Sequence, residues 1–366
     1  MIKVLYLLNH AGKAGTERYV HSLIERLNGT HIKAYFAYNE EGLLVDRLKD
    51  MGVETYRVAM KNPFDIRAAF ELSRLCRRLG IDLIHTQFLR ENYIALLSRF
   101  FNPGVRVMYT NHFIMANNLA QRICNRVLTR LEANIIAVCN KGKAMMISNG
   151  VNRKRINVIF NGVDPDFWGD RVESTMRKEF GIDQDAFVLL CASRFAHDKG
   201  HRFLINSVAE LKKLTDKKFK CVLANDGPLL EERKQQAASL ELTGDIIFTG
   251  FRKDVKNLIA GSNLYINSSE HEALSFAIIE MLAAGLPVIA TDMGGNDDII
   301  NGETNCGILV KYDDSRALAE AIIKVMDSEE LQKNLKENAL KAIKEKFNLD
   351  KMVKETYNLY MDSVAK

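Results

Sequence analysis

The regular alternation of short apolar runs with amphipathic stretches constrains the fold of this chain more than any other feature. The short runs are rich in Val, Ile and Leu, which favours strands, and the stretches between them show the apolar spacing of helices. Because parallel strands need a crossover connection, this alternation predicts parallel sheets covered by helices on both faces. The predicted strands are residues 3–8, 33–37, 54–58, 83–85, 106–109, 134–138 and 157–160 in the first half, and 187–192, 220–224, 246–249, 264–267, 287–290 and 307–310 in the second.

The length of the chain and the positions of its Gly and Asp residues indicate how these elements divide into domains. A chain of 366 residues suggests two domains of roughly 150 residues each. Residues 161–185 carry Gly and Asp and no evident strand, so we expect the linker there. The predicted fold is α/β, with two tandem Rossmann-like, doubly wound domains (1–163 and 164–345) facing a central cleft, and a last helix (346–366) packing back toward the first domain. The predicted helices are residues 16–27, 66–79, 92–101 and 119–131, then 202–214, 229–239, 255–260, 276–284, 316–326 and 330–346.

Several classes of protein are disfavoured by what the sequence lacks. No apolar run approaches the ~18 residues that span a bilayer, and the apolar start is too short for a signal peptide. There is no G-x-x-x-x-G-K-[ST] loop, and no G-x-G-x-x-G follows the first strand, which disfavours ATPases and dinucleotide-dependent dehydrogenases. None of the six cysteines forms a C-x-x-C pair, so we expect reduced, buried thiols in a cytosolic protein.

Positive charge is concentrated in the first half of the chain. Residues 1–163 hold 24 Lys and Arg against 12 Asp and Glu, a net charge of +12, whereas the remainder carries −7. This asymmetry indicates that the first half meets something anionic; the alternative is a solvated basic surface without a partner. No nucleic-acid partner is expected, because neither an aromatic-rich basic strand motif nor a helix-turn-helix signature accompanies the charge.

The most informative segment is a predicted helix with one carboxylate among apolar residues. Ser275 can cap this helix and Gly285 can close it, and between them Glu280 is the only charged residue. A helix that is apolar on nearly all sides is buried, so Glu280 needs hydrogen-bond donors. The two hydroxyls of a ribose would supply them, as would a backbone or Arg partner in the core. Glu272 precedes the helix in an E-x7-E spacing, where it would suit a hydroxylated ligand such as a sugar.

Two basic residues fit the same site. Arg194 follows the predicted strand 187–192, and Lys199 lies where the next loop turns into a helix. Arg can bind a diphosphate through two hydrogen bonds and Lys acts as a point charge, so the pair suits a diphosphate leaving group. The alternative is two ordinary surface side chains.

In these residues, the chain resembles the retaining nucleotide-sugar glycosyltransferases of the GT-B fold, family 4 (group 1). The resemblance spans essentially the whole chain in the expected order. The matching pieces are Ala14-Gly-Thr-Glu-Arg18, Asp82-Leu-Ile-His85, Asn161-Gly-Val-Asp164, Arg194 with Lys199, Asp226-Gly-Pro228, Glu272-x7-Glu280 and Gly285-Leu-Pro-Val-Ile-Ala-Thr-Asp292-Met-Gly-Gly295.

The resemblance implies roles for individual residues. Glu280 corresponds to the ribose-binding Glu, Glu272 to the acid facing the donor sugar, and Arg194 and Lys199 to the pair on the diphosphate. His112 corresponds to the active-site histidine near the transferred sugar. The resemblance also predicts that Gly15, Phe251, Arg252, Ala273, Leu274 and Ser275 line the donor site.

Two departures from the family pattern affect these expectations. The chain reads Glu272-Ala-Leu-Ser275 where many relatives read Glu-Gly-Phe-Gly or Glu-Gly-Leu-Pro, so side chains narrow the space beside the diphosphate. Relatives often have a second histidine near the position of Gln87, which leaves the acceptor contacts there open.

The function that the resemblance implies is transfer of a hexose or hexosamine, with retention, from a nucleotide diphosphate sugar, with UDP preferred. The acceptor would be a glycan or lipid-linked molecule of cell-envelope or polysaccharide biosynthesis. No metal or other cofactor is expected, and Asp164-Pro-Asp166 and Asp183-Gln-Asp185 are interpreted as turns rather than manganese ligands. The alternatives are a nucleotide-sugar epimerase of the same architecture and a non-catalytic nucleotide-binding subunit.

A basic helix predicts where the enzyme works. Arg122, Arg126 and Arg130 share one stripe of the predicted helix 119–131, beside an apolar stripe, and Lys141 and Lys143 follow. Such a helix on the acceptor-side domain suits an anionic membrane surface. We therefore expect a cytoplasmic protein held peripherally at the inner face of the membrane; the alternative is a solvated helix face.

Overall fold

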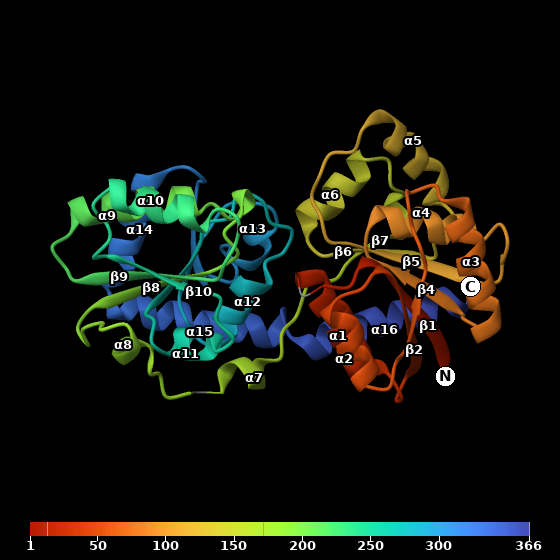
Figure 1. Ribbon diagram of the computed structural model, residues 1–366, viewed down its shortest axis with the longest axis horizontal. Coiled ribbons are helices and arrows are strands. Elements are labelled where there is room, and N and C mark those ends of the chain that lie inside the picture. The colour runs from red at the N-terminus through yellow and green to blue at the C-terminus, as the bar shows by residue number, and fades with distance from the viewer. Residues whose placement is uncertain (13, 171, 366) are drawn as a thin grey trace. The chain divides into compact units, whose positions relative to one another are not determined.

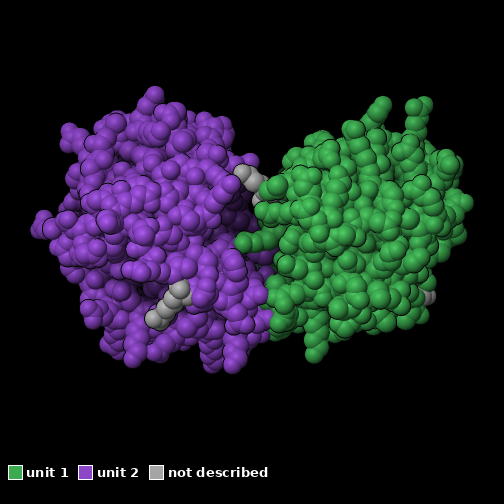
Figure 2. Space-filling view, turned by 60° about the horizontal axis from the view of Figure 1, so that its bottom comes forward, with its two compact units in different colours: residues 1–161, 349–366 green, residues 162–348 purple. Residues whose placement is uncertain are grey.

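The computed structural model describes residues 1–12, 14–170 and 172–365. The chain forms two compact units, coloured separately in Figure 2. Unit 1 comprises Met1–Asn161 together with Leu349–Lys366, and unit 2 comprises Gly162–Asn348. Most of the predicted linker therefore belongs to unit 2, where it contains the short helices α7 (Pro165–Gly169) and α8 (Met176–Glu179).

Each unit is built on one parallel sheet (Figure 1). The first sheet has the order β3-β2-β1-β4-β5-β6-β7, and the second has the equivalent order β10-β9-β8-β11-β12-β13. Both are the doubly wound order, which confirms the predicted fold class. The strands are β1 (Ile2–His10), β2 (Ile32–Glu40), β3 (Glu54–Arg57), β4 (Leu83–Thr86), β5 (Arg106–Asn111), β6 (Asn134–Ala137) and β7 (Ile156–Val158), then β8 (Phe187–Ala192), β9 (Phe219–Ala224), β10 (Ile246–Gly250), β11 (Leu264–Asn267), β12 (Val288–Thr291) and β13 (Gly307–Val310).

The helices between the strands largely follow the predicted pattern. Among the described residues, five helices lie outside the predicted set: α2, α6, α7, α8 and α13. The apolar spacing of α2 and α6 is short or interrupted by Gly and Lys, and the other three have only four or five residues, too few to show a helical period. Unit 1 contains α1 (Gly15–Leu27), α2 (Leu43–Asp50), α3 (Ile66–Leu79), α4 (Leu89–Ser98), α5 (Leu119–Leu128), α6 (Asn140–Ser148) and α16 (Leu349–Ala365). Unit 2 adds α9 (His201–Leu214), α10 (Leu230–Ser239), α11 (Val255–Ala260), α12 (Phe276–Ala283), α13 (Asn296–Ile299), α14 (Ser315–Met326) and α15 (Glu329–Glu345).

Helices α4 and α5 and the last helix, α16, differ from their predicted bounds by three residues at one end or both. Helix α4 begins at Leu89, three residues earlier than predicted, and α5 ends at Leu128 instead of residue 131. Thr129 is the C-cap of α5, and both its backbone N–H and its hydroxyl donate to the Asn125 carbonyl. Ala133 then donates its backbone N–H to Val107 and starts the return to the sheet. Arg130 therefore lies beyond the helix rather than on its stripe.

Side-chain alternation along β1 explains how unit 1 is covered on both faces. Leu5 and Leu7 belong to the apolar cluster that includes residues of α3 and α4. Tyr6 points to the other face, as the period of two requires, and its hydroxyl accepts a hydrogen bond from Tyr360 of α16. Tyr360 also lies 2.8 Å from His85 Nδ1, and α16 contacts α1 (Figure 1). This buried polar network holds the last helix within unit 1.

Candidate functional site

The carboxyl edges of the two sheets are where ligands are expected. In each sheet the chain reverses its winding direction between two neighbouring strands, β1 and β4 in unit 1 and β8 and β11 in unit 2. Loops that leave such neighbours diverge, and open α/β proteins bind ligands in the resulting crevice. Most of the predicted site residues lie in loops that follow these strands or the strands next to them.

In unit 2 this edge holds a close pair of opposite charges. Lys199 Nζ lies 2.9 Å from Glu272 Oε1 and 3.4 Å from an Asp198 carboxylate oxygen. The Ser269 hydroxyl also donates to Glu272 Oε1, at 2.9 Å. The pair joins the loop after β8 to the loop after β11, so it spans the switch point. Burial opposes charge on Lys199, but Glu272 and Asp198 outweigh it, and the pKa of Lys199 is raised.

Two glycines hold these loops in close contact. Gly200 has φ of +64°, and a Cβ there would lie 1.9 Å from the Ser268 carbonyl oxygen. Gly294 has φ of +59°, and a Cβ there would lie 1.8 Å from the Glu272 carbonyl oxygen. Both positions therefore exclude any side chain. The backbone that carries Lys199 and Glu272 is fixed by packing before any ligand arrives.

Helix α12 has the caps and the burial that the sequence predicts. The Ser275 hydroxyl accepts a hydrogen bond from the Ile278 backbone N–H, and Gly285 ends the helix with φ of +74°. Glu280 is 7% exposed. Asn267 Nδ2 also lies 3.3 Å from the Ser275 hydroxyl, so this hydroxyl is engaged inside the fold. Ala273 accepts a hydrogen bond from the Gly295 N–H, and the neighbouring Leu274 is buried.

The other predicted donor-binding residues are spread along the same edge. Arg194 is exposed in the loop after β8, and Phe251 is exposed after β10. Arg252 forms ion pairs with Glu179 of α8 and with Asp254. Its guanidinium is engaged within unit 2. Arg252 follows β10, which is the outermost strand of the second sheet, so it lies away from the switch point between β8 and β11. The roles of Arg194, Phe251 and Arg252 stay predictions.

In unit 1, His112 follows β5 at the carboxyl edge. Its Nε2 lies 2.9 Å from the Gln87 side-chain oxygen, and its ring meets the Tyr19 ring edge-on at 4.9 Å between centroids. Burial lowers the pKa of His112, so the ring is neutral near pH 7. Gly15 is the first residue of α1, whose Glu17 carboxylate accepts from the N–H groups of Gly12 and Ala14, at 3.1 Å each.

The surface of α5 is both basic and apolar. Arg122, Arg126 and Arg130 are all exposed, and so are Ile123 and Val127, at 54% and 61%. Of the predicted basic residues on α6, Lys141 is exposed and Lys143 is half-buried. The further exposed apolar side chains around α5 and α6 are Phe113, Met115, Leu119, Leu131 and Ile147. No helix in the described part of the chain is long and apolar enough to cross a bilayer.

The side chains of the two Asp-x-Asp sequences make local contacts in unit 2. Asp164 caps α7 by accepting from the N–H groups of Asp166 and Phe167. Asp183 and Asp185 each lie 3.1 Å from Lys218 Nζ on the surface. Across residues 1–12, 14–170 and 172–365, no three His, Cys, Asp or Glu side chains are grouped to hold a metal ion.

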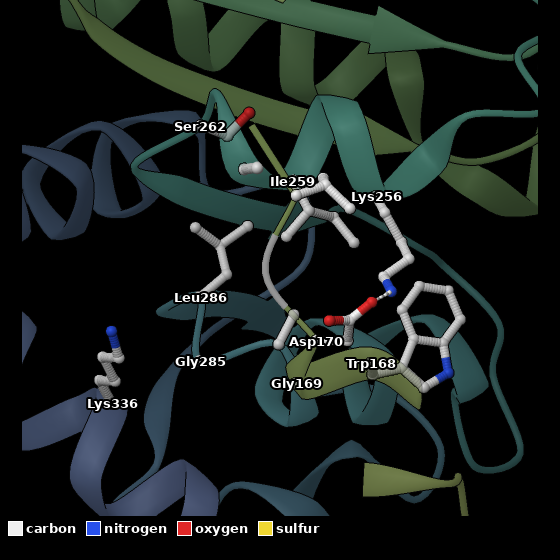
Figure 3. Close-up of a pocket in the computed structure, with 12 residues that line it drawn as sticks. Trp168, Gly169, Asp170, Lys256, Ile259, Ser262, Gly285, Leu286 and Lys336 are labelled. Atoms are coloured by element: carbon white, nitrogen blue, oxygen red, sulfur yellow. Dashed lines mark hydrogen bonds and ion pairs between the residues drawn. The ribbon is translucent and has the colours of Figure 1, made fainter. Parts of the chain in front are cut away.

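Unit 2 also contains a pocket of about 260 Å³, shown in Figure 3. Ser262 and Leu286, which line it, lie two residues before the starts of β11 and β12. The pocket therefore lies at the amino edge of the sheet, opposite the loops that carry Lys199 and Glu272. Lys256 and Asp170 pair within it at 3.0 Å. This position disfavours the pocket as the donor site.

Two residues that the sequence analysis did not assign to the site are central to unit 1. Glu91 accepts a hydrogen bond from the Asn9 N–H and so spans the switch point of the first sheet. Gln87 contacts His112. Placing the start of α4 at residue 92 left Glu91 outside the helix. Gln87 directly follows a strand at the ligand edge, and that position alone was a usable signal.

Comparisons with known proteins agree with this architecture. A relative from Bacillus anthracis, N-acetyl-alpha-D-glucosaminyl L-malate synthase, is 25% identical over 86% of this chain and 83% of its own length. A relative from Escherichia coli, UDP-Gal:alpha-D-GlcNAc-diphosphoundecaprenol alpha-1,3-galactosyltransferase, is 24% identical over 82% of this chain and 80% of its own. The crystal structure of Anabaena HepE in complex with UDP has a TM-score of 0.87 at 20% identity and covers 98% of this chain and 100% of its own.

Two family models match consecutive parts of the sequence. The model described as Glycosyltransferase Family 4 matches residues 14–167, and the model described as Glycosyl transferases group 1 matches residues 172–342. The two matches leave only the ends of the chain and four residues between them uncovered. The chain therefore belongs to the group 1 glycosyltransferases of the GT-B fold.

Proposed function

We propose that this glycosyltransferase moves a hexose or hexosamine, with retention, from a UDP-linked donor to a glycan or lipid-linked acceptor of cell-envelope or polysaccharide biosynthesis. The observation that carries the proposal is the Lys199–Glu272 contact at the switch point of the second sheet. A cation and a sugar-facing acid at one crevice suit a donor that has both a diphosphate and hydroxyl groups. The names of the relatives, which include a UDP-galactose-dependent transferase with a diphosphoundecaprenol acceptor, support the same class.

Each residue has a distinct role in this proposal. Glu280 binds the ribose hydroxyls, and Glu272 faces the donor sugar. Lys199 and Arg194 neutralise the charge that develops on the departing diphosphate, so no metal ion is needed. His112 accepts a hydrogen bond from a hydroxyl of the transferred sugar or of the acceptor.

Two other functions predict different products. An epimerase would change the sugar without an acceptor, and a non-catalytic subunit would release no nucleotide at all. Membership of the glycosyltransferase family favours transfer. Nucleotide release measured with and without candidate acceptors separates the three, because only a transferase couples release to an acceptor.

Binding of the donor nucleotide is expected to raise the melting temperature of the protein. At 100 times the dissociation constant, a ligand stabilises the folded state by ~2.7 kcal/mol. We expect UDP-sugars to give this shift in a panel that also contains GDP- and ADP-sugars. Glu280→Ala should weaken binding by roughly 1.5–3 kcal/mol, because a charged hydrogen-bond partner of the ribose is lost.

Glu280→Gln, which keeps the side-chain volume, is the companion variant for this panel. It should also bind the nucleotide more weakly while melting like the wild type without ligand. Calorimetric titration gives the affinities directly. Unchanged affinity in both variants would remove Glu280 from the nucleotide site.

We also propose that α5 holds the enzyme at an anionic membrane surface. The exposed arginines lie beside exposed apolar side chains at i and i+4 positions, Ile123 and Val127. Apolar residues can enter the headgroup region while arginines contact acidic lipids. Each basic residue near such a surface contributes about 1 kcal/mol, so several together can give reversible attachment.

Liposome sedimentation should show binding that requires anionic lipid and weakens with salt. The Arg122/Arg126/Arg130→Glu variant is expected to lose this binding, and Ile123→Ser with Val127→Ser to reduce it. A matched control changes three exposed arginines of α3, Arg74/Arg77/Arg78→Glu, and so lowers the net charge of the same unit by the same amount. If both triple variants lose liposome binding equally, the lipid is attracted to the net positive charge of unit 1, and α5 has no special role.

A further inference from the structure

Among the residues that the structure describes, the imidazole of His112 makes one side-chain hydrogen bond, and the chemistry of its partner restricts the position of the ring proton. Nε2 lies 2.9 Å from Oε1 of Gln87. An amide oxygen only accepts hydrogen bonds, so the ring must donate from Nε2. A neutral imidazole has one N–H, and the Nδ1 atom of His112 then carries a lone pair.

The surroundings of His112 favour the neutral ring. Its ring lies against the edge of Tyr19 and 6.2 Å from the ring of Phe88 between centroids. Tyr19 contacts the ring and His85 interacts with it electrostatically, and burial keeps both of these groups uncharged near pH 7. A positive charge on the ring would be costly in this buried setting, because no carboxylate forms an ion pair with His112 among the described residues.

Gln87 is well placed to act as a rigid partner. It is fully buried and lies between the end of β4 and Phe88, the residue that precedes α4. The backbone on both sides of Gln87 is therefore held by regular structure. Its Nε2 has no hydrogen-bond partner within the described residues, and its Oε1 contacts the His112 ring.

We propose that Gln87 is a positioning residue that holds His112 as the Nε2–H tautomer and presents Nδ1 as a hydrogen-bond acceptor. His112 is only partly buried, and Nδ1 makes no hydrogen bond within the described residues. Nδ1 is thus the ring nitrogen available to a substrate, and it can accept from a hydroxyl but cannot donate. This inference rests on the proposed role of His112, and it specifies that the group His112 meets is a hydroxyl donor.

The tautomer can be measured without any activity assay. Nitrogen-15 spectra of the histidine rings distinguish Nε2–H, Nδ1–H and imidazolium forms, and His112→Ala identifies the His112 signal. We expect the Nε2–H form in the wild type and a mixture of tautomers in Gln87→Leu. His201, a buried histidine of unit 2, provides an internal reference whose signal should not change. A wild-type Nδ1–H ring, or an unchanged His112 signal in Gln87→Leu, would overturn the inference and leave the transferase assignment intact.

Kinetics and pH then test whether positioning matters for the reaction. Gln87→Leu should lower kcat about tenfold, the size of one lost hydrogen bond, with unchanged donor affinity. Gln87→Glu keeps an acceptor for Nε2–H but favours the imidazolium, because a carboxylate replaces the amide. Its activity should therefore be lost at low pH and return toward the wild-type level as the pH rises. Gln332→Leu, the same substitution in unit 2 at a side chain bonded to the Val325 carbonyl, is the matched control and should be neutral.

The proposed role of His112 and the inference about Gln87 can be contradicted by different results. Full activity of His112→Ala would overturn both that role and the kinetic consequence assigned to Gln87. Loss of transfer in His112→Ala, together with full kcat and a flat pH response in the Gln87 variants, would overturn the inference alone.

Discussion

Replacing Lys199 by alanine is expected to lower turnover by about 10²–10³ while donor binding changes much less. The charge on a diphosphate grows as the glycosidic bond breaks, so a fixed cation stabilises the transition state more than the ground state. Lys199 is suited to this role because Glu272 and Asp198 hold its ammonium at the switch point, with its side chain only 23% exposed. Steady-state kinetics should show the loss in kcat, and Arg194→Ala should change kcat in the same direction.

Lys256→Ala is a close control for this experiment. Its side chain is 22% exposed, pairs with Asp170 at 3.0 Å and lies in the same unit, but at the opposite edge of the sheet. We expect wild-type turnover in this variant. A chelator should leave the wild-type rate unchanged, since the proposed mechanism uses side-chain cations. Loss of activity in EDTA with recovery in manganese would contradict the metal-free mechanism, and a rise in KM alone in Lys199→Ala would contradict a leaving-group role.

The stability of unit 1 is expected to fall as the pH rises, and Glu132→Gln should remove part of this fall. Glu132 is fully buried, and its pKa is raised to about 8 by burial, which outweighs the hydrogen bond from Asn92 and the charge of Arg155. The folded-state pKa thus exceeds the ordinary value of 4.5. The unfolded chain gains by ionising above pH ~4.5 and the folded chain does not, so stability is complete below that pH and is lost as the pH rises through about 8.

Urea unfolding across this range measures the effect. The difference in the free energy of unfolding between wild type and Glu132→Gln should change by up to about 1.4 kcal/mol for each pH unit. As the pH rises, the variant should become the more stable of the two relative to its value at low pH. Glu91 also lowers the stability as the pH rises, because burial raises its pKa to about 7. Both proteins contain Glu91, so its effect cancels in the difference between them. Glu71→Gln, at an exposed position of α3, should show the wild-type pH dependence. Parallel curves for wild type and Glu132→Gln would show that Glu132 ionises freely in the folded state.

Local patterns were sufficient to predict the strands and most of the longer helices. Strands such as β8 and β11 were found from apolar runs, and the cap at Ser275 and the burial of Glu280 were found from residue type and helical spacing. These features depend on neighbours within one or two turns of the chain, so a single sequence contains the necessary information. The start of α4 was missed because its N-cap, Phe88, makes no side-chain cap that residue type could signal, and the end of α5 because the apolar spacing continues to Leu131, beyond the C-cap at Thr129.

The sequence by itself determined the alternation of strands and helices, the buried carboxylate of α12 and the positions of Arg194, Lys199 and Glu272 after strands. Only the tertiary structure decided which of these side chains meet. Lys199 and Glu272 are 73 residues apart, and His112 and Gln87 are 25 apart, so each contact follows from strand order and loop packing. The same holds for Tyr360, which reaches His85 across 275 residues. Periodicity shows which face of an element is buried, whereas contacts between elements arise from the packing of the whole chain.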